Sequence, residues 1–389
     1  MGTHFREHLL RAALRFIKAH DRRTPDPSKL GTAAIERILA ISCTAIGDTL
    51  MSTPALRSLR LAYPNAHISL LLNKRYVTLF ANNPDIDEII PYAGGYRRFF
   101  RLAWALNRQR FDVALILHGN EPQATPLAYL SGADYCFKLP NDNDFRFLLS
   151  NAEPVLRWEA FAHGIDQRLA VAALAGGAQT DRAMTLTPSA AAMARLNARI
   201  AARDIPPEAQ LIGFQAGAST VSRRWSSGRF IELGKRLLKR LPDTWIVLTG
   251  SADERPLAEI IASGIDHPRV WIAAGEPSLE EMPALMQRLQ ILLTGDTGPM
   301  HMALAVGTSV IALFAVSDWR RSGPASELGK HVVIQKWRTC DPCLSKRCPY
   351  AEPLCMASIG IDEVEQAILS RLSGAPGAIS ENSAPGAAV

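Results

Sequence analysis

The sequence predicts an α/β protein built from two doubly wound parallel sheets in tandem. Short apolar runs alternate with helical patterns along most of the chain, which is typical of βαβ units. The alternation restarts after Asp204-Ile205-Pro206-Pro207-Glu208, a segment typical of a domain boundary. With 389 residues, of which 48% are hydrophobic, the chain is long enough for two domains with full cores.

The elements of the first half follow from this alternation. Apolar runs predict strands at 38–42, 68–72, 88–90 and 111–117. Helical patterns predict helices at 49–62, 97–108, 163–175 and 188–202. Strands separated by helices indicate a parallel sheet with helices on both faces.

The second half repeats the pattern and closes with a helix. We expect strands at 211–215, 245–249, 270–273 and 291–293, with a further apolar run from Ser309, and helices at 228–240, 254–262, 279–289 and 299–306. The predicted organisation is an N-terminal extension (1–34), a first domain (35–204), a second domain (205–360), a last helix (361–372) and a tail (373–389). The tail has nothing to bury, so we expect it to be disordered.

The N-terminal extension admits two interpretations. Residues 5–19 form an amphipathic helical pattern with basic residues on one face, which suits an anionic membrane surface. The same pattern suits a helix packed on its own domain. The start of the chain lacks the features of a signal peptide and no apolar run is long enough to span a bilayer, so a cytoplasmic protein is the default expectation.

The net charge of +6 is compatible with an acidic ligand, a membrane surface or nucleic acid. Nucleic-acid binding is the least supported of these, because no surface motif interleaves aromatic and basic residues.

The turn Gly295-Asp296-Thr297-Gly298 is the most informative segment. It follows an apolar strand run and precedes a helix that begins at Pro299, where the missing N–H of proline costs nothing. A helix start presents free N–H groups and the positive end of the helix dipole, which suits a phosphate. We therefore expect this turn, with His301 just inside the helix, to bind an anionic, nucleotide-linked ligand.

Three further turns end predicted strands. Asp48 follows the first strand, Ser219 and Arg223 follow the first strand of the second domain, and Glu254 follows the next. Each turn also has a purely structural interpretation. Asp48 and Glu254 are typical of the first turn of a helix, and the loop that contains Arg223 could simply be a solvent-exposed basic loop. Two parallel sheets whose carboxyl edges face each other would place these turns across a cleft.

The joint pattern resembles family 9 glycosyltransferases, the ADP-heptose:lipopolysaccharide heptosyltransferases. The segments that carry the resemblance are Ile46-Gly47-Asp48-Thr49-Leu50 with Thr53-Pro54-Ala55-Leu56-Arg57, then Gly217-Ala218-Ser219 with Arg224-Trp225, and Asp296-Thr297-Gly298-Pro299-Met300-His301 with Ala303-Leu304-Ala305. The resemblance implies a two-domain GT-B fold with the donor in the C-terminal domain and the acceptor in the N-terminal one. It also implies metal-independent, inverting transfer from a nucleotide sugar, so no cofactor for catalysis.

Carried over by position, the resemblance assigns roles to individual residues. Asp48 matches the general base. The matches to the donor site are Ser219, Arg223, Glu254, Asp296, Thr297, Gly298 and His301. The family commonly has Lys where this chain has Arg223, which leaves the donor geometry there open. A lipopolysaccharide core is rich in phosphate and acidic sugars, and Arg97, Arg98 and Arg101, with Arg108 and Arg110, would suit it. A solvated basic helix face is the alternative for these arginines.

Four of the six cysteines are clustered: Cys340, Cys343, Cys348 and Cys355. Four thiols this close suit a structural zinc, with an iron–sulfur cluster or reduced thiols as alternatives. Stable disulfides are disfavoured in a cytoplasm.

Other functions are considered on the same residues. A nucleotide-sugar epimerase or dehydrogenase would need a Gly-x-Gly-x-x-Gly turn after the first strand, and residues 42–49 contain only Gly47. A non-catalytic nucleotide-sugar-binding protein would not need Asp48, which is present. A glycosyltransferase that uses another nucleotide sugar or a protein acceptor stays open. So does peripheral contact with the inner membrane.

Overall fold

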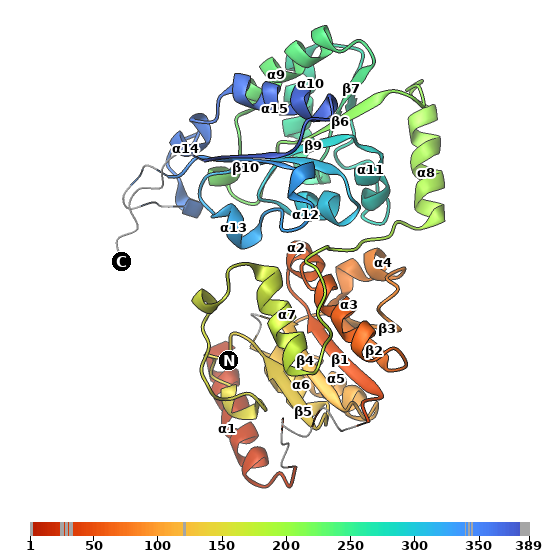
Figure 1. Ribbon diagram of the computed structural model, residues 1–389. Helices are drawn as coiled ribbons and strands as arrows, with labels where there is room; N and C mark the ends of the chain where they lie inside the picture. The colour runs from red at the N-terminus through yellow and green to blue at the C-terminus, as the bar shows by residue number, and fades with distance from the viewer. Residues whose placement is uncertain are drawn as a thin grey trace. The chain divides into compact units, whose positions relative to one another are not determined.

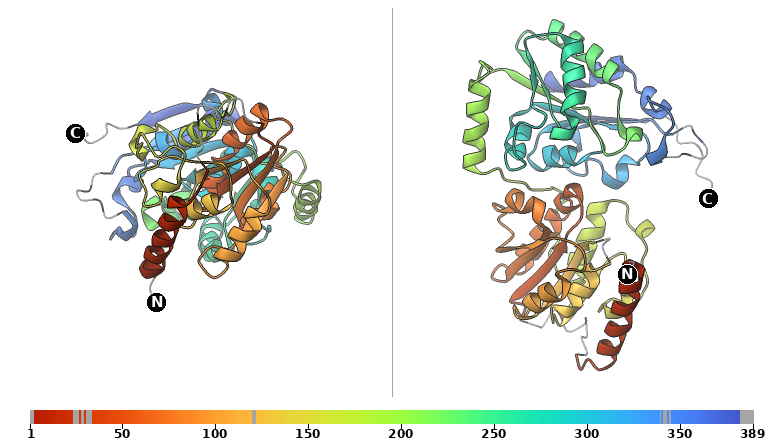
Figure 2. Two further views of the ribbon diagram at one scale, coloured as in Figure 1. Left: turned by 90° about the horizontal axis from the view of Figure 1, so that it is seen from below. Right: turned by 180° about the vertical axis from the view of Figure 1, so that it is seen from behind.

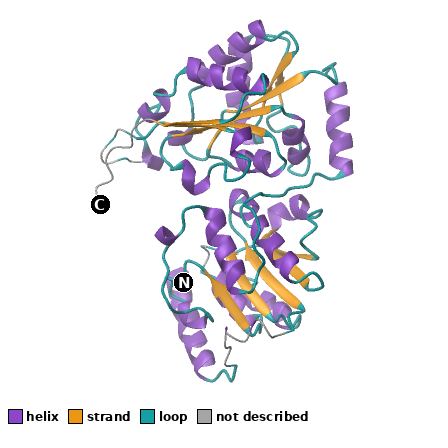
Figure 3. Cartoon of the chain, in the orientation of Figure 1, coloured by secondary structure: helices purple, strands orange, loops and turns teal. Residues whose placement is uncertain are grey.

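The computed structural model describes residues 3–23, 27, 30, 34–119, 122–338, 340, 343 and 345–381. It divides into two compact units, Met1–Arg182 and Ala183–Val389. In each unit a sheet lies between layers of helices (Figures 1 and 3). All strand pairs are parallel, so the predicted doubly wound α/β architecture is confirmed.

Unit 1 contains a five-stranded sheet in the order β3-β2-β1-β4-β5. Its strands are β1 (Arg37–Ser42), β2 (His67–Asn73), β3 (Glu88–Tyr92), β4 (Val113–His118) and β5 (Tyr135–Lys138). The central strand β1 is buried along all but its first residue, as expected for a parallel strand covered by helices on both faces.

The helices of unit 1 cover both faces of this sheet. They are α1 (Thr3–Ala19), α2 (Ile46–Leu50), α3 (Thr53–Ala62), α4 (Val77–Phe80), α5 (Phe99–Asn107), α6 (Ala124–Leu130) and α7 (Gly164–Leu174). Short 3-10 turns occur at Lys74–Tyr76, Arg146–Leu148 and Trp158–Ala160. Helix α3 packs against α7 on one face, and α5 packs against α6 on the other.

Helix α1 packs on unit 1. Leu10 and Leu14, one turn apart, are buried in the same apolar cluster as Phe99 of α5 and Leu127 of α6. The guanidinium of Arg11 pairs with Asp144 at 2.9 Å on the same unit. Of the two interpretations of this helix, packing on its own domain is therefore confirmed for the buried stripe.

Unit 2 contains a seven-stranded sheet in the order β12-β11-β10-β9-β6-β7-β8. Its strands are β6 (Gln210–Gln215), β7 (Thr244–Leu248), β8 (Val270–Ile272), β9 (Ile291–Gly295), β10 (Ser309–Phe314), β11 (Val332–Gln335) and β12 (Ala378–Glu381).

The helices of unit 2 are α8 (Ala190–Ala201), α9 (Ser227–Arg240), α10 (Arg255–Ile265), α11 (Met282–Arg288), α12 (Gly298–Ala305), α13 (Trp319–Ser322), α14 (Leu354–Ala357) and α15 (Ile361–Leu372). Further 3-10 turns lie at Val221–Arg223, Ala252–Glu254, Leu328–Lys330 and Ser345–Arg347. Helices α9, α10 and α15 lie on one face of the sheet, with α11 and α12 on the other (Figure 1). On the face covered by α9, α10 and α15, the core is formed by alternate side chains of the strands and by the apolar stripes of these three helices.

Each sheet has one place where the direction of strand succession reverses. In unit 1 it lies between β1 and β4, and in unit 2 between β6 and β9. At such a point the two following connections run to opposite faces of the sheet and leave a crevice at the carboxyl ends of the strands, where ligands bind in open α/β sheets.

The domain boundary lies earlier than predicted. The units divide between Arg182 and Ala183, not after residue 204, because α8 packs on unit 2. Arg195 of α8 pairs with Glu280 at 3.0 Å, and Ser189 at the start of α8 hydrogen-bonds the same carboxylate at 3.1 Å. The prolines at 206 and 207 therefore separate α8 from β6 within one unit.

Two other expectations are corrected. The tail was expected to be disordered from residue 373, but Ala378–Glu381 forms β12, which pairs with β11 along backbone hydrogen bonds. Residues 382–389 lie outside the described residues. The predicted helix 49–62 consists of two helices, α2 and α3, separated by a turn at Met51-Ser52. No helix in the described part of the chain combines the length and apolarity needed to cross a membrane.

Candidate functional site

Asp48 lies at the place in unit 1 where the strand order reverses. It is in the first turn of α2, directly after β1, and the helix is capped by Ala45 without a side-chain hydrogen bond. The Asp48 carboxylate is therefore not a helix cap, which was its ordinary alternative. About a third of its side chain is exposed (29%), so one side of the carboxylate is open to a ligand.

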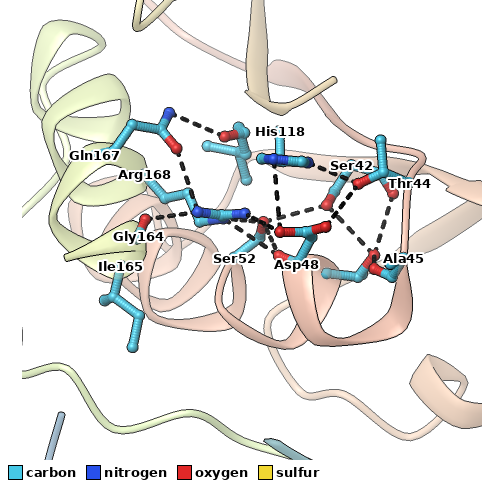
Figure 4. A network of polar contacts seen from close by, with 12 residues as sticks. Ser42, Thr44, Ala45, Asp48, Ser52, His118, Gly164, Ile165, Gln167 and Arg168 are labelled. Atoms are coloured by element: carbon cyan, nitrogen blue, oxygen red, sulfur yellow. Dashed lines mark hydrogen bonds and ion pairs between the residues drawn. The ribbon is translucent and has the colours of Figure 1, made fainter. Parts of the chain in front are cut away.

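A fully buried arginine forms an ion pair with the Asp48 carboxylate. Arg168 of α7 is 1% exposed, and its Nη2 lies 3.1 Å from Asp48 Oδ1. Its Nε donates to the Asp48 carbonyl and to Ser52 Oγ, each at 3.2 Å, and its Nη1 donates to the Gly164 carbonyl at 2.6 Å (Figure 4). Burial lowers the pKa of Arg168 to about 10, an effect that the negative charge of Asp48 opposes. Arg168 is therefore still a cation at neutral pH and fixes the position of the carboxylate.

His118 contacts the other side of Asp48. It ends β4, and a register shift after Ile41 places it beside Ser42 at the end of β1. Its Nε2 lies 3.5 Å from Asp48 Oδ1, and its Nδ1 lies 2.6 Å from Thr44 Oγ1 (Figure 4). Burial lowers the pKa of His118 to about 4, and the nearby Arg168 charge acts in the same direction while Asp48 opposes it. The imidazole is therefore neutral at pH 7.

The Asp48 cluster is thus a partly exposed carboxylate held by a buried cation and a neutral imidazole. Thr44 Oγ1 also lies 3.3 Å from Asp48 Oδ2, which restricts rotation of the carboxyl group. A carboxylate that is oriented in this way and open on one side is suited to accept a proton from a hydroxyl group.

In unit 2, two of the predicted turns meet where the strand order reverses. Arg223 follows β6 and Asp296 follows β9, and the two strands are neighbours. Arg223 Nη1 lies 3.4 Å from Asp296 Oδ2 and donates to the Asp296 carbonyl at 3.3 Å. A Cβ on Gly295 would stand 2.8 Å from the Arg223 carbonyl, so the close approach of these turns requires glycine there.

The start of α12 completes this part of the site. Thr297 is the N-cap residue and makes no side-chain capping bond; its hydroxyl lies 2.9 Å from Thr294 Oγ1. Gly298 is the first helical residue, with proline next to it. The free N–H groups of this turn, beside the Arg223 guanidinium, form a setting that attracts a phosphate. His301 lies one turn into the helix and is buried.

Glu254 closes over the turn that follows β6. Its carboxylate accepts hydrogen bonds from the Ser251 N–H at 2.8 Å and from Gln215 Nε2 at 3.4 Å. A Cβ on Gly217 would stand 1.9 Å from Glu254 Oε1, so the two turns touch only because residue 217 is glycine. Ser219 follows in the same turn and is exposed. Glu254 also forms a capping box with Ser251, which is the structural alternative for this residue.

The predicted acceptor arginines are only partly grouped. Arg97, Arg98 and Arg101 are exposed around the start of α5, which follows the edge strand β3. Arg108 and Arg110 follow the other end of α5, so the five arginines are divided between the two ends of that helix.

The clustered cysteines carry free thiols. Cys355 is buried and the other three are partly exposed. Burial raises the pKa of the Cys355 thiol, and the nearby Cys343 and Cys348 act in the same direction. Among the residues that the structure describes, no three His, Cys, Asp or Glu side chains are arranged so that they could hold a metal ion. The predicted zinc site is therefore not confirmed and stays a prediction.

Sequence reasoning missed the partners that orient the two carboxylates. His118 could have been found, because it directly follows the apolar run 111–117 and so ends a predicted strand. Arg168 gave no such signal, since it lies within an ordinary helix far along the chain. In unit 2, Ser317 donates to Asp296 Oδ2 at 2.8 Å, and it too was not predicted.

Comparisons with known proteins identify a family that the chain resembles. The model of glycosyltransferase family 9, described as heptosyltransferase, matches residues 99–353. Lipopolysaccharide heptosyltransferase 2 of Salmonella typhimurium is 27% identical over 313 residues, which cover 77% of this chain and 88% of that protein.

Two solved structures are similar over most of the chain. A family 9 glycosyl transferase from Veillonella parvula gives a TM-score of 0.74 at 21% identity, covering 87% of this chain and 98% of that one. The E. coli ADP-heptose lps heptosyltransferase II gives a TM-score of 0.71 at 23% identity, covering 87% and 99%. These likenesses confirm the predicted GT-B fold class.

Proposed function

The chain belongs to glycosyltransferase family 9, and on that premise we propose that it moves a heptose from ADP-heptose to the lipopolysaccharide inner core or a related glycan. The observation that carries the proposal is Asp48: a partly exposed carboxylate at the reversal point of unit 1, held by a buried arginine. The names of the relatives supply the sugar and the acceptor class.

In the proposed reaction, an acceptor hydroxyl oxygen attacks the anomeric carbon of the heptose. A C–O bond to the acceptor forms, the C–O bond to the diphosphate breaks, and ADP leaves with the bonding electrons. Asp48 takes the hydroxyl proton during the attack, which makes the oxygen a better nucleophile. Attack from the side opposite to the leaving group inverts the configuration at the anomeric carbon.

The donor residues are those of unit 2. Arg223 and the N–H groups at Thr297 and Gly298 offset the charge that develops on the leaving diphosphate. Asp296 and His301 contact the sugar side of the donor, Ser219 donates to phosphate, and Glu254 accepts from the ribose hydroxyls. Because protein groups can supply this positive charge, the proposed step requires no metal ion.

The acceptor binds unit 1 in this proposal. Arg97, Arg98 and Arg101 neutralise phosphate and acidic sugars of the core, since guanidinium groups form paired hydrogen bonds with such anions. The acceptor is linked to lipid, so the reaction takes place in the cytoplasm at the face of the inner membrane.

The test is turnover of ADP-heptose against other nucleotide sugars on a defined lipopolysaccharide core acceptor. We expect transfer from ADP-heptose alone. Transfer only from another nucleotide sugar would refute the assignment of ADP-heptose as the donor. Transfer only to a protein would refute the assignment of a lipopolysaccharide core or related glycan as the acceptor.

The structural zinc remains a separate proposal. Metal analysis of protein purified without chelator decides it: one metal ion per chain that is lost in Cys355→Ser supports zinc, and less than a tenth of that amount refutes it.

A further inference from the structure

Helices α1 and α5 of unit 1 expose large apolar side chains to solvent. Within the described part of unit 1, the exposed aromatic side chains are Phe16 of α1 (70%) and Phe100 and Trp104 of α5 (72% and 61%). Leu9 and Ile17 of α1 are exposed as well. A cluster of exposed aromatic and aliphatic side chains of this kind indicates a binding surface.

The two groups of side chains are brought near each other where the last turns of α1 and α5 meet at one depression. Ile17 of α1 and Asn107 of α5 line the same shallow depression on the surface of unit 1. Phe100, Trp104 and Asn107 are spaced by four and three residues, so they lie on the same side of α5. Figure 2 shows α1 and α5 on one side of the sheet of unit 1.

Of the exposed apolar residues of α1, Ile17 lines this depression. Phe16 and Ile17 follow Leu9 by seven and eight residues, about two helical turns, so the three residues share one side of the helix. They lie next to the buried stripe of Leu10 and Leu14, which fixes the orientation of α1 on the unit. We call these five exposed residues, Leu9, Phe16, Ile17, Phe100 and Trp104, the α1/α5 apolar surface.

Basic side chains of α5 flank the α1/α5 apolar surface. Arg101 is exposed in the first turn of α5, and the Arg108 guanidinium lies 4.8 Å from the centre of the Trp104 ring. Arg15 of α1 is exposed, but its guanidinium lies 5.5 Å from the centre of the Phe147 ring, so α5 supplies the rim. Glu7 is the only acidic residue among the described side chains of the two helices. The rim is therefore positive around an aromatic and aliphatic centre.

From this arrangement we infer that the α1/α5 apolar surface docks on an anionic lipid bilayer. Aromatic rings with a cationic rim suit the boundary between headgroups and acyl chains, where the rings enter the apolar layer and the guanidinium groups meet phosphate. A neutral apolar partner would not select the positive rim. The choice of a membrane as the partner rests on the proposed function, because a lipid-linked acceptor is presented at such a bilayer.

The surface combines residues that the sequence treats separately. The basic face of α1 by itself does not make the contact, since Arg11 is paired with Asp144 and the Lys18 amine lies 5.2 Å from the centre of the Tyr129 ring. The docking residues of α1 are its exposed apolar ones, and α5 supplies both aromatic side chains and arginines.

The test is sedimentation of the full chain with vesicles. The triple variant Phe16→Ser, Phe100→Ser, Trp104→Ser removes the aromatic centre, and Leu61→Ser is the matched control, because Leu61 is equally exposed (57%) on α3, which packs on the other face of the sheet. All four positions are exposed, so the variants should fold, which thermal unfolding checks.

We expect the native chain and Leu61→Ser to bind vesicles of phosphatidylglycerol and phosphatidylethanolamine. The triple variant should bind about tenfold less or weaker still. Binding should be weaker to phosphatidylcholine vesicles, which are neutral, and at high salt. Removing one basic residue, as in Arg108→Ser, should weaken binding to the anionic vesicles about fivefold. Native binding that is absent, or unchanged in the triple variant, overturns the inference.

Two further outcomes separate this inference from the proposed function. Transfer to a soluble core oligosaccharide without vesicles should be unchanged in the triple variant. If the native chain binds vesicles but transfers no sugar, the proposed function fails and the surface stands. A concentration-dependent dimer that the triple variant abolishes would identify the surface as a contact between copies of this chain and refute lipid docking.

Discussion

Replacing Asp48 with asparagine tests the proposed reaction most directly. Asparagine has the size of aspartate and can still accept a hydrogen bond from Arg168, but it cannot take a proton at neutral pH. A general base contributes roughly 10²–10⁴ to the rate of such a step. We therefore expect kcat of Asp48→Asn to fall by about that factor, with the Kd for ADP changed less than about twofold.

The same substitution removes the ionic partner of a buried cation. Breaking a fully buried ion pair costs about 3–5 kcal/mol of unfolding free energy. The Asp48 carboxylate is 29% exposed and partly screened by water. The expected loss is therefore smaller, about 1–2 kcal/mol.

Asp85→Asn is the matched control for this loss of stability. Asp85 is nearly buried in the same unit and accepts two hydrogen bonds from Arg57 Nε, at 2.9 and 2.8 Å. Its carboxylate has no role in the proposed reaction, so Asp85→Asn should lower stability and leave kcat within about twofold. Chemical denaturation, calorimetric titration with ADP and steady-state transfer measure the three quantities. Turnover of Asp48→Asn within tenfold of the native enzyme would refute its role as the base.

Three more predictions follow from named contacts. The pKa of His118 is lowered to about 4, so the unfolded chain binds more protons than the native protein between pH 6.5 and 4, and the native protein loses stability as the pH falls through that window. His118→Gln should remove about 2–3 kcal/mol of this loss, as measured by denaturation at pH 7.5 and 4.5. An unchanged pH dependence of stability in this variant would contradict the lowered pKa. Gly217→Ala would place its Cβ 1.9 Å from Glu254 Oε1 and should raise the KM for the nucleotide sugar about tenfold or more. Gly228→Ala is the control, because the space around its Cβ is open and the KM should not change. Equal KM values for the two variants would argue against a donor role for Glu254. Leu14→Ala should lower the free energy of unfolding by about 2–5 kcal/mol because Leu14 is buried. Leu9→Ala, at an exposed position, should lower it by about 0.5 kcal/mol or less. Equal effects of the two substitutions in denaturation would show that α1 does not pack as described.

The regular part of the fold could be predicted from local patterns. Strand β1 and helix α9 each contain enough residues for the apolar period to be evident, and their predicted bounds agree with the structure to within one residue. Strands β5, β11 and β12 have only four residues each, too few for a period to stand out, and they were missed. Strand β12 is also exposed on most of its residues, so its pairing with β11 depends on backbone hydrogen bonds that no side-chain pattern reports.

The position of Asp48 was determined by the sequence itself. A buried run followed by Ile46-Gly47-Asp48-Thr49 predicts a carboxylate at the carboxyl edge of a parallel sheet, and the structure has it there. The same holds for Asp296 and the start of α12, since strand, turn and helix are adjacent in the chain and local geometry suffices.

What surrounds these carboxylates was decided only by the tertiary structure. Arg168 lies 120 residues beyond Asp48, and His118 reaches it through a register shift between β1 and β4. Neither relation has a signature in the sequence, because a contact between distant segments depends on how the sheet and its helices pack rather than on local propensity. The exposed rings of α1 and α5 are a second example: two separate amphipathic patterns are local, but only packing of both helices on the same unit makes them one surface.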